Sequence, residues 1–163
     1  MTPSDFIIRD IKPGDNKQIA TVIRSVLIEF GVPKVGTAYE DEATDAMFEA
    51  YQEKNTNYYV VEYNNKIVGG AGYAKLDNFD GNVCELQKMY FLPITRGKGL
   101  GSKLIEHCLL NAKKNGYEKC YLETMPYMEA ARNLYKKNGF LNIDKPMGNT
   151  GHYSCNVWML KDL

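Results

Sequence analysis

The sequence predicts a single α/β (α+β) domain built on one mixed, mostly antiparallel sheet of six or seven strands. Three observations indicate this class. The 163-residue chain supports one core, and no linker, repeat or low-complexity run divides it, so the domain is placed over residues 1–163. Residues 58–76 read as two strands joined by a hairpin turn at Asn64 and Asn65. Residues 83–124 read as strand, glycine-rich turn, helix and strand, the order of a crossover between parallel strands.

The first third of the chain is expected to contain one strand and two helices. Residues 6–11 alternate weakly between apolar and polar side chains and read as a short strand, which Pro13 and Gly14 end. Apolar side chains then recur at the spacing of one helix face, which predicts a helix over residues 18–30: Ile19, Val22, Ile23, Val26, Leu27 and Phe30. Residues 42–51 repeat the pattern over a shorter length and predict a second helix.

The remaining elements follow from the same patterns. The expected order is strands over 58–63, 66–76 and 83–91, a helix over 100–114, a strand over 119–124, a helix from Pro126 to Asn138, and strands over 140–143 and 153–160. Gly116 and Gly139 stand where the two helices should stop. Together with residues 6–11, these segments supply the strands of one sheet.

Composition excludes several classes of protein. The 20 Lys and Arg residues balance 20 Asp and Glu residues. A net charge of zero argues against binding of nucleic acid through the overall field of the protein and leaves only a local basic patch, so no nucleic-acid partner is expected. No stretch approaches the ~20 apolar residues that span a bilayer, so no membrane partner is expected. Residues 1–5 lack the basic and then apolar profile of a secretion signal, which leads us to expect a cytoplasmic protein.

Cysteine and histidine spacing gives no sign of a metal site. The cysteines are Cys84, Cys108, Cys120 and Cys155, and none of them forms a CxxC pair. We therefore expect no bound metal and four reduced thiols, mostly buried as small apolar side chains. His152 and Cys155 lie near the expected last strand; they could reach the acceptor side, but a packing role at that strand is expected.

The turn at residues 96–102, of sequence RGKGLGS, carries the clearest functional signal. It stands between a strand and the long helix that follows, where unpaired amides and the positive end of the helix dipole favour an anion. Glycines at 97, 99 and 101 let the backbone N–H groups turn toward one point. Arg96, Lys98 and Lys103 add positive charge, so a phosphate or pyrophosphate is the natural ligand. A glycine-rich turn that only permits tight packing is the alternative.

Two common nucleotide motifs do not fit this turn. The dinucleotide motif GxGxxG, begun at Gly97, needs a glycine where Ser102 stands. A P-loop needs a glycine five residues before Gly101, where Arg96 stands, and a lysine directly after it. The spacing thus leaves a phosphate ligand of another kind.

Two motifs resemble those of the GNAT superfamily of acyl-CoA-dependent N-acetyltransferases. Residues 85–93 (ELQKMYFLP) followed by 96–101 (RGKGLG) are similar to its central motif, and residues 131–140 (ARNLYKKNGF) to its second motif. The resemblance covers about residues 57–145. It implies a sheet with helices on both faces, a V-shaped opening that binds acetyl-CoA, and direct transfer of the acetyl group to a primary amine of a small molecule, peptide or protein.

The resemblance also implies a set of cofactor contacts. The pyrophosphate of CoA would lie against Arg96, Gly97, Lys98, Gly99, Leu100, Gly101 and Ser102. The backbone of Met89, Tyr90 and Phe91 would contact the pantetheine and the thioester. One departure stands out, because many members carry Asn where this chain has Met128. A polar contact to the cofactor is thereby lost.

Glu85 and Tyr135 are the candidate catalytic residues. A lysine-like amine has a pKa of ~10.4, so neutralising it at pH 7 costs ~4.6 kcal/mol, and a general base would help. By its spacing to Arg96, Glu85 matches the catalytic Glu of the histone-modifying branch of the family, with Glu123 as a second candidate. Tyr135 occupies the family position of the acid that receives the departing thiolate. The structural alternatives are a solvated carboxylate at the end of a strand and a core tyrosine.

The sequence leaves three candidate functions and one candidate oligomeric state. The leading one is acetyl transfer, the second a non-catalytic CoA-binding sensor, and the third a binder of another phosphate ligand. No recognised motif selects the acceptor. Apolar Val157, Trp158 and Met159 are expected to be exposed on the last strand, which would allow a homodimer.

Overall fold

The computed structural model describes residues 5–163. Residues 1–4, which include the start of the expected domain and most of the segment compared with a secretion signal, lie outside the described residues. Within 5–163 one seven-stranded sheet forms in the order β1-β2-β3-β4-β5-β7-β6. Its strands are β1 (Ile7–Asp10), β2 (Asn57–Tyr63), β3 (Lys66–Lys75), β4 (Val83–Phe91), β5 (Lys119–Thr124), β6 (Leu141–Ile143) and β7 (Val157–Asp162). Only β4 and β5 pair in parallel, which confirms the expected fold class.

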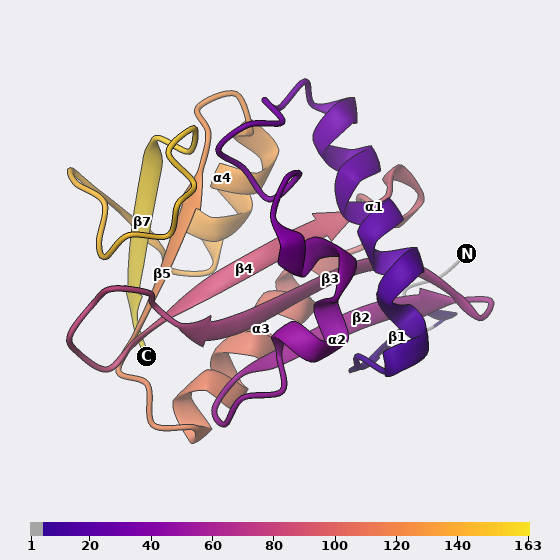
Figure 1. Ribbon diagram of the computed structural model, residues 1–163, viewed down its shortest axis with the longest axis horizontal. Coiled ribbons are helices and arrows are strands. Elements are labelled where there is room, and N and C mark those ends of the chain that lie inside the picture. Colours follow the sequence, from indigo (N-terminus) through magenta and orange to yellow (C-terminus); the bar gives the residue numbers. More distant parts are fainter. Residues whose placement is uncertain (1–4) are drawn as a thin grey trace.

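Helices cover both faces of this sheet, as expected (Figure 1). The α-helices are α1 (Asn16–Glu29), α2 (Met47–Ala50), α3 (Leu100–Lys114) and α4 (Glu129–Lys137), joined by the short 3₁₀ turns η2 (Pro13–Asp15), η3 (Glu42–Asp45) and η4 (Pro93–Thr95). The apolar faces of α1 and α2 pack on one face of the sheet, and those of α3 and α4 pack on the other. No helix between residues 5 and 163 is long and apolar enough to cross a membrane.

Three predicted elements are wrong in their boundaries. The helix expected from Pro126 begins at Glu129, because Met128 has a non-helical ψ of 58°. The expected helix over 42–51 is broken at Ala46, whose φ of −137° separates η3 from α2. The Thr44 hydroxyl donates to the carbonyl of Ala38, which ties η3 back to the preceding loop. The last strand begins at Val157 rather than at 153, because the backbone N–H and the hydroxyl of Ser154 bond to the loop after α1 instead of to a strand.

A β-bulge at Lys88 bends β4. Lys88 has a φ of +49°, and the register with β3 shifts between Gly70 and Gly72. The Tyr58 hydroxyl donates to the Lys88 carbonyl across 2.7 Å and braces the bulge. Gly70 makes room for this brace, because an added Cβ there would lie 2.7 Å from the Tyr58 ring. Gly70 of β3 thus allows the contact that stabilises the bulge in β4.

The bulge lies where β4 and β5 separate. The two strands pair only at Val83–Lys119, Cys84–Cys120 and Glu85–Tyr121. Beyond Glu85 the remaining six residues of β4 have no partner on β5. This produces the V-shaped opening that the family resemblance implies.

The predicted exposure of the last strand is wrong. Met159 is fully buried, and Val157 and Trp158 are half-buried, because β7 lies between β5 and β6 rather than at an edge. The apolar residues that were expected to be exposed and to allow a homodimer therefore pack within the sheet. Cys84, Cys108 and Cys120 are buried free thiols, as expected, whereas Cys155 is half-buried.

Candidate active site

The backbone N–H groups of the glycine-rich turn are free to bind an anion. From Gly97 to Ser102, no N–H donates to any acceptor within residues 5–163, and the first intrahelical bond of α3 runs from Lys103 to Gly99. Gly97 and Gly99 have φ values of +75° and +74°, which side-chain-bearing residues adopt only at a cost. The turn therefore holds several donors at the positive end of α3.

Gly101 is required for a different reason. It has an ordinary helical φ, but an added Cβ would lie 2.6 Å from Leu134 on α4. The three glycines thus combine two roles: the first two shape the turn, and Gly101 lets α4 approach α3. Close packing thus accounts for Gly101, whereas an added Cβ at Gly97 or Gly99 would meet nothing within 4 Å.

The Arg96 side chain is held by the end of α1. Its guanidinium pairs with Glu29 and donates to the carbonyl of Phe91 across 2.8 Å. It also lies 5.0 Å from the ring centre of Phe30. Arg96 is therefore fixed at the wall of the turn instead of extending freely into solvent.

A cavity of about 390 Å³ runs from this turn along the open edge of β4. Its wall includes the turn residues from Arg96 to Ser102 except Lys98, the three β4 residues Met89, Tyr90 and Phe91, and residues of α4 such as Ala131 and Tyr135. Lys98 does not line it. Nine of the ten sequence-predicted cofactor residues are therefore brought together here.

A smaller cavity of about 90 Å³ continues into the opening between β4 and β5. Met89, Tyr90, Met128, Ala131 and Tyr135 line both spaces, so they stand at the junction. The thioether of Met128 is where many family members place an amide, and the junction is correspondingly apolar.

Glu85 lies at the other end of the inner cavity. It is only 6 % exposed, and burial raises its pKa to about 7. The nearby charge of Glu123 raises it further, whereas the Gln87 amide and the positive charges of His152 and Lys88 oppose the rise. The solvated-carboxylate alternative is therefore wrong. Glu85 is a buried carboxyl that titrates near neutral pH.

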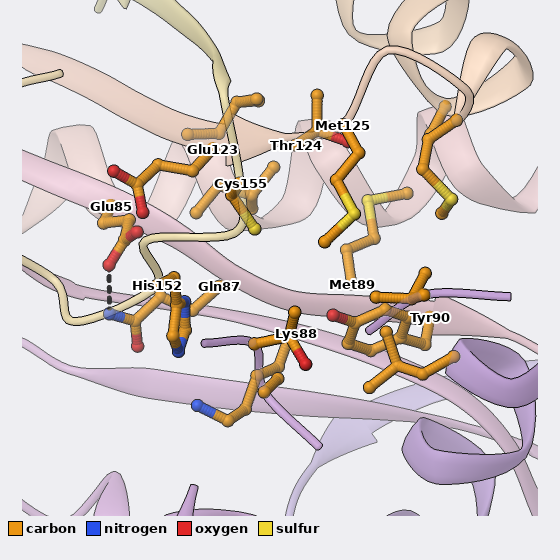
Figure 2. A pocket seen from close by; sticks show the side chains of 18 of the residues that line it. Glu85, Gln87, Lys88, Met89, Tyr90, Glu123, Thr124, Met125, His152 and Cys155 are labelled. Atoms are coloured by element: carbon orange, nitrogen blue, oxygen red, sulfur yellow. Dashed lines mark hydrogen bonds between the residues drawn. The ribbon is translucent and has the colours of Figure 1, made fainter. Parts of the chain in front are cut away.

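A hydrogen-bond chain orients Glu85. The Gln87 side-chain N–H donates to Glu85 Oε1 across 2.7 Å, drawn as the dashed line in Figure 2. The Tyr51 hydroxyl donates to Gln87 Oε1 across 2.6 Å, which fixes the amide with its nitrogen toward Glu85. Neither Gln87 nor Tyr51 was among the residues predicted from the sequence. Gln87 could have been found, because residues i and i+2 of a strand face the same side.

Glu123 faces the same cavity but is already engaged. Its two carboxylate oxygens accept hydrogen bonds from the hydroxyls of Tyr121 and Thr150. A carboxylate with both oxygens occupied by local donors is a poorer proton acceptor than Glu85. Glu123 instead acts on Glu85 through its charge.

Tyr135 is buried at the junction of the two cavities. Its ring packs edge-to-face against Phe140 with centres 6.1 Å apart. Its hydroxyl has no hydrogen-bond partner within residues 5–163, and burial raises its pKa to about 12. Tyr135 therefore combines the core position with a donor directed at the cavity system.

His152 and Cys155 were expected to pack at the last strand, which is wrong. Both belong to the loop before β7 and line the inner cavity (Figure 2). His152 Nε2 lies 2.7 Å from Asp41 Oδ2, and the Lys88 ammonium lies 3.1 Å from the same oxygen. The Asp41 contact raises the pKa of His152, and the two positive partners lower the pKa of Asp41 against the effect of burial.

An outer groove of about 1380 Å³ adjoins the inner cavity. Glu85, Gln87, Lys88 and His152 line both. The cofactor-side cavity, the inner cavity and the outer groove therefore form one path, with a backbone anion site at one end and ionisable side chains at the other. A path with unpaired backbone donors at one end and ionisable side chains at the other is typical of a group-transfer enzyme.

Comparisons with known proteins identify the class more closely. Residues 24–140 match the model of the Acetyltransferase (GNAT) family. A protein of Escherichia coli named uncharacterized N-acetyltransferase YjgM is 41% identical over 164 residues, which covers 100% of this chain and 98% of that protein. The chain therefore belongs to the GNAT family and is an N-acetyltransferase of that family.

Solved structures agree with the fold. A GNAT-family acetyltransferase from Staphylococcus aureus superimposes with a TM-score of 0.86 at 23% identity and covers 97% of this chain and 99% of its own. A phosphinothricin acetyltransferase from Sinorhizobium meliloti, solved in complex with AcCoA, gives a TM-score of 0.77 at 17% identity and covers 98% and 89%. At these identities the similarity concerns the fold alone.

Proposed function

We propose that the protein transfers an acetyl group from acetyl-CoA to a primary amine of a small molecule, peptide or protein by direct attack in a ternary complex. The observation that carries this proposal is the continuous path from the glycine-rich turn, past Tyr135, to Glu85. Donor and acceptor can approach the junction from opposite sides, so no acyl-enzyme is needed.

The free backbone donors fit the pyrophosphate of acetyl-CoA. In this proposal the N–H groups from Gly97 to Ser102 bind the phosphates, with Arg96 and Lys98 adding charge at the rim. Pantetheine lies along the unpaired edge of β4 against Met89, Tyr90 and Phe91. Acetyl-CoA supplies an activated thioester; the protein supplies position and protons.

Glu85 acts as the general base in this mechanism. An ordinary glutamate, with a pKa of ~4.3, is a weak base, whereas a carboxyl with a pKa of about 7 is ionised in roughly half of the molecules at neutral pH and binds a proton far more strongly. Glu85 faces the acceptor groove, where it can take the proton that the amine loses during attack, directly or through water.

Tyr135 stabilises the leaving sulfur by hydrogen bonding. Its pKa of about 12 exceeds that of a thiol, ~8.5, so full transfer of the phenolic proton would be uphill by about 5 kcal/mol. A hydrogen bond to the developing thiolate avoids that cost. This refines the role that the family position implies for Tyr135.

Two measurements test the proposal. Titration calorimetry with CoA should show binding, and release of free thiol from acetyl-CoA should depend on an added amine. We expect Tyr135→Phe to lower kcat by about tenfold or more with little change in CoA affinity, the size of one hydrogen bond to a charged group. Unchanged turnover by that variant would remove the assigned role. Binding of CoA without turnover of any amine would favour the sensor instead.

A further inference from the structure

We propose that Lys88 and His152 form a carboxylate-binding subsite in the acceptor groove, so that the acceptor is a compact amino acid whose carboxylate lies beside its reacting amine. The inference rests on the proposed function and specifies its acceptor. It is carried by the position, burial and partners of these two side chains.

Lys88 has more hydrogen-bond donors than partners. Its side chain is only 9 % exposed, and its ammonium carries three N–H donors. Within residues 5–163, its one acceptor is Asp41 Oδ2 at 3.1 Å. Lys88 lines both the inner cavity and the outer groove, so its remaining donors can reach a molecule bound there. Two donors are thus available to a bound anion.

The backbone places this ammonium on the acceptor side. The bulge at Lys88 brings its side chain to the same side as Glu85 and Gln87, although strict alternation along β4 would point it the other way. A φ of +49° is unfavourable for a long side chain, and the Tyr58 hydroxyl holds this conformation. The local strain is therefore maintained by the surrounding structure at a residue that faces the acceptor path.

His152 completes the subsite from the opposite wall. Its Nε2 contacts the Asp41 oxygen that Lys88 also contacts, which holds both cationic groups on one carboxylate. Within the described chain, its other ring nitrogen has no partner. When His152 is protonated, Lys88 and His152 together exceed the charge of Asp41 by one. This charge, together with the unused Lys88 donors, can bind one carboxylate, with the hydrogen-bonded Glu123 carboxylate as the opposing charge nearby.

The neighbouring carboxylates leave room for such a ligand. Glu123 accepts two hydroxyl donors, and Glu85 is partly protonated near neutral pH. The amine of an amino acid would approach Glu85 while its carboxylate contacts Lys88. Exposed carboxylates at the rim, Glu42, Glu53, Asp77 and Asp80, attract cations, but solvent screens their effect. The buried ammonium is the stronger determinant at the reacting end.

The test compares each amino acid with its own primary amide. Thiol release from acetyl-CoA is measured for several amino acids, their amides and a linear diamine, after calorimetry has established that CoA binds. The amide lacks only the negative charge, and its amine is intrinsically less protonated. We expect the acids nevertheless to have the higher kcat/KM, by about tenfold to a hundredfold, the loss when a charged hydrogen-bond partner is removed.

Lys88→Met should reduce the acid-to-amide ratio of kcat/KM by a similar factor, mainly through KM, and Lys88→Arg should retain part of it. Lys66→Met, an exposed change in the β2–β3 hairpin, is the matched control and should leave the ratio unaltered. Equal use of acids and amides, or a preference for the diamine, by the unmodified enzyme would overturn the subsite while acetyl transfer stands. Absence of CoA binding would overturn both.

Discussion

The two sides of the β4–β5 opening are built on different principles. The cofactor side is one continuous turn whose free backbone N–H groups from Gly97 to Ser102 are the proposed binding groups. The acceptor side is assembled from side chains of separate segments: Asp41, Tyr51, Glu85 with Lys88, and His152. A backbone site depends on conformation and tolerates many side chains. A side-chain site depends on each residue, so the acceptor side can change specificity while the cofactor side stays the same.

The largest effect should come from removing the base on the acceptor side. Glu85→Gln should lower kcat/KM for a lysine-like amine by about 10²–10⁴-fold, the usual contribution of a general base. The loss should be smaller for an amine with a pKa near 7.8, because less free energy is needed to neutralise it. Steady-state assays with matched amines check this, and CoA titration of the variant should resemble that of the unmodified enzyme. An equal loss with both amines would contradict the role of base.

Glu85→Gln should also be more stable than the unmodified protein at high pH. Because the folded-state pKa of Glu85 is raised to about 7, the folded protein holds its proton more tightly than the unfolded chain does, and stability falls as the pH rises from about 4.5 to 7. At pH 8 this costs up to about 3 kcal/mol, which Glu85→Gln removes. Urea unfolding at pH 5 and pH 8 measures the difference. If the stability difference between Glu85→Gln and the unmodified protein is the same at pH 8 as at pH 5, Glu85 is not desolvated.

The cofactor side should respond to backbone conformation instead. Gly99→Ala has nothing within 4 Å to clash with, but its φ of +74° costs a side-chain-bearing residue about 1–2 kcal/mol. We expect CoA affinity to fall by about five- to thirtyfold, because the competent turn is less populated.

Gly116→Ala is the matched control for that change. Its φ is +93°, it too has open space around it, and it lies at the far end of α3. It should lose comparable stability in a thermal melt and keep its CoA affinity. Equal losses of affinity in both variants would mean that the turn is not the anion site.

The same difference explains what the sequence could predict. Residues 96–102 are adjacent in the chain, so their glycines, basic side chains and following helix indicate the anion site directly. His152 lies at the site through contacts between distant segments that no local pattern indicates: its own bond to Asp41, and the bonds of Ser154 to the loop after α1. Periodicity likewise predicted the apolar face of residues 42–51 but not the break at Ala46, beside which the Thr44 hydroxyl bonds to Ala38 in the preceding loop.

The smallest effect tests whether the acceptor side acts as a connected unit. Gln87→Leu removes the N–H donor that favours the ionised form of Glu85, so the pKa of Glu85 should rise further. The acidic limb of the pH profile of kcat/KM should then move to higher pH by about one unit, as expected for loss of a hydrogen bond to a charged group. Tyr51→Phe should move it in the same direction by less, because the Gln87 amide remains but is no longer held in one orientation. The charges of Lys88, His152 and Glu123 around Glu85 are unchanged in both variants. If the acidic limb of the pH profile does not move in either variant, packing alone orients Glu85. The acceptor side would then depend less on individual side-chain hydrogen bonds than the structure indicates.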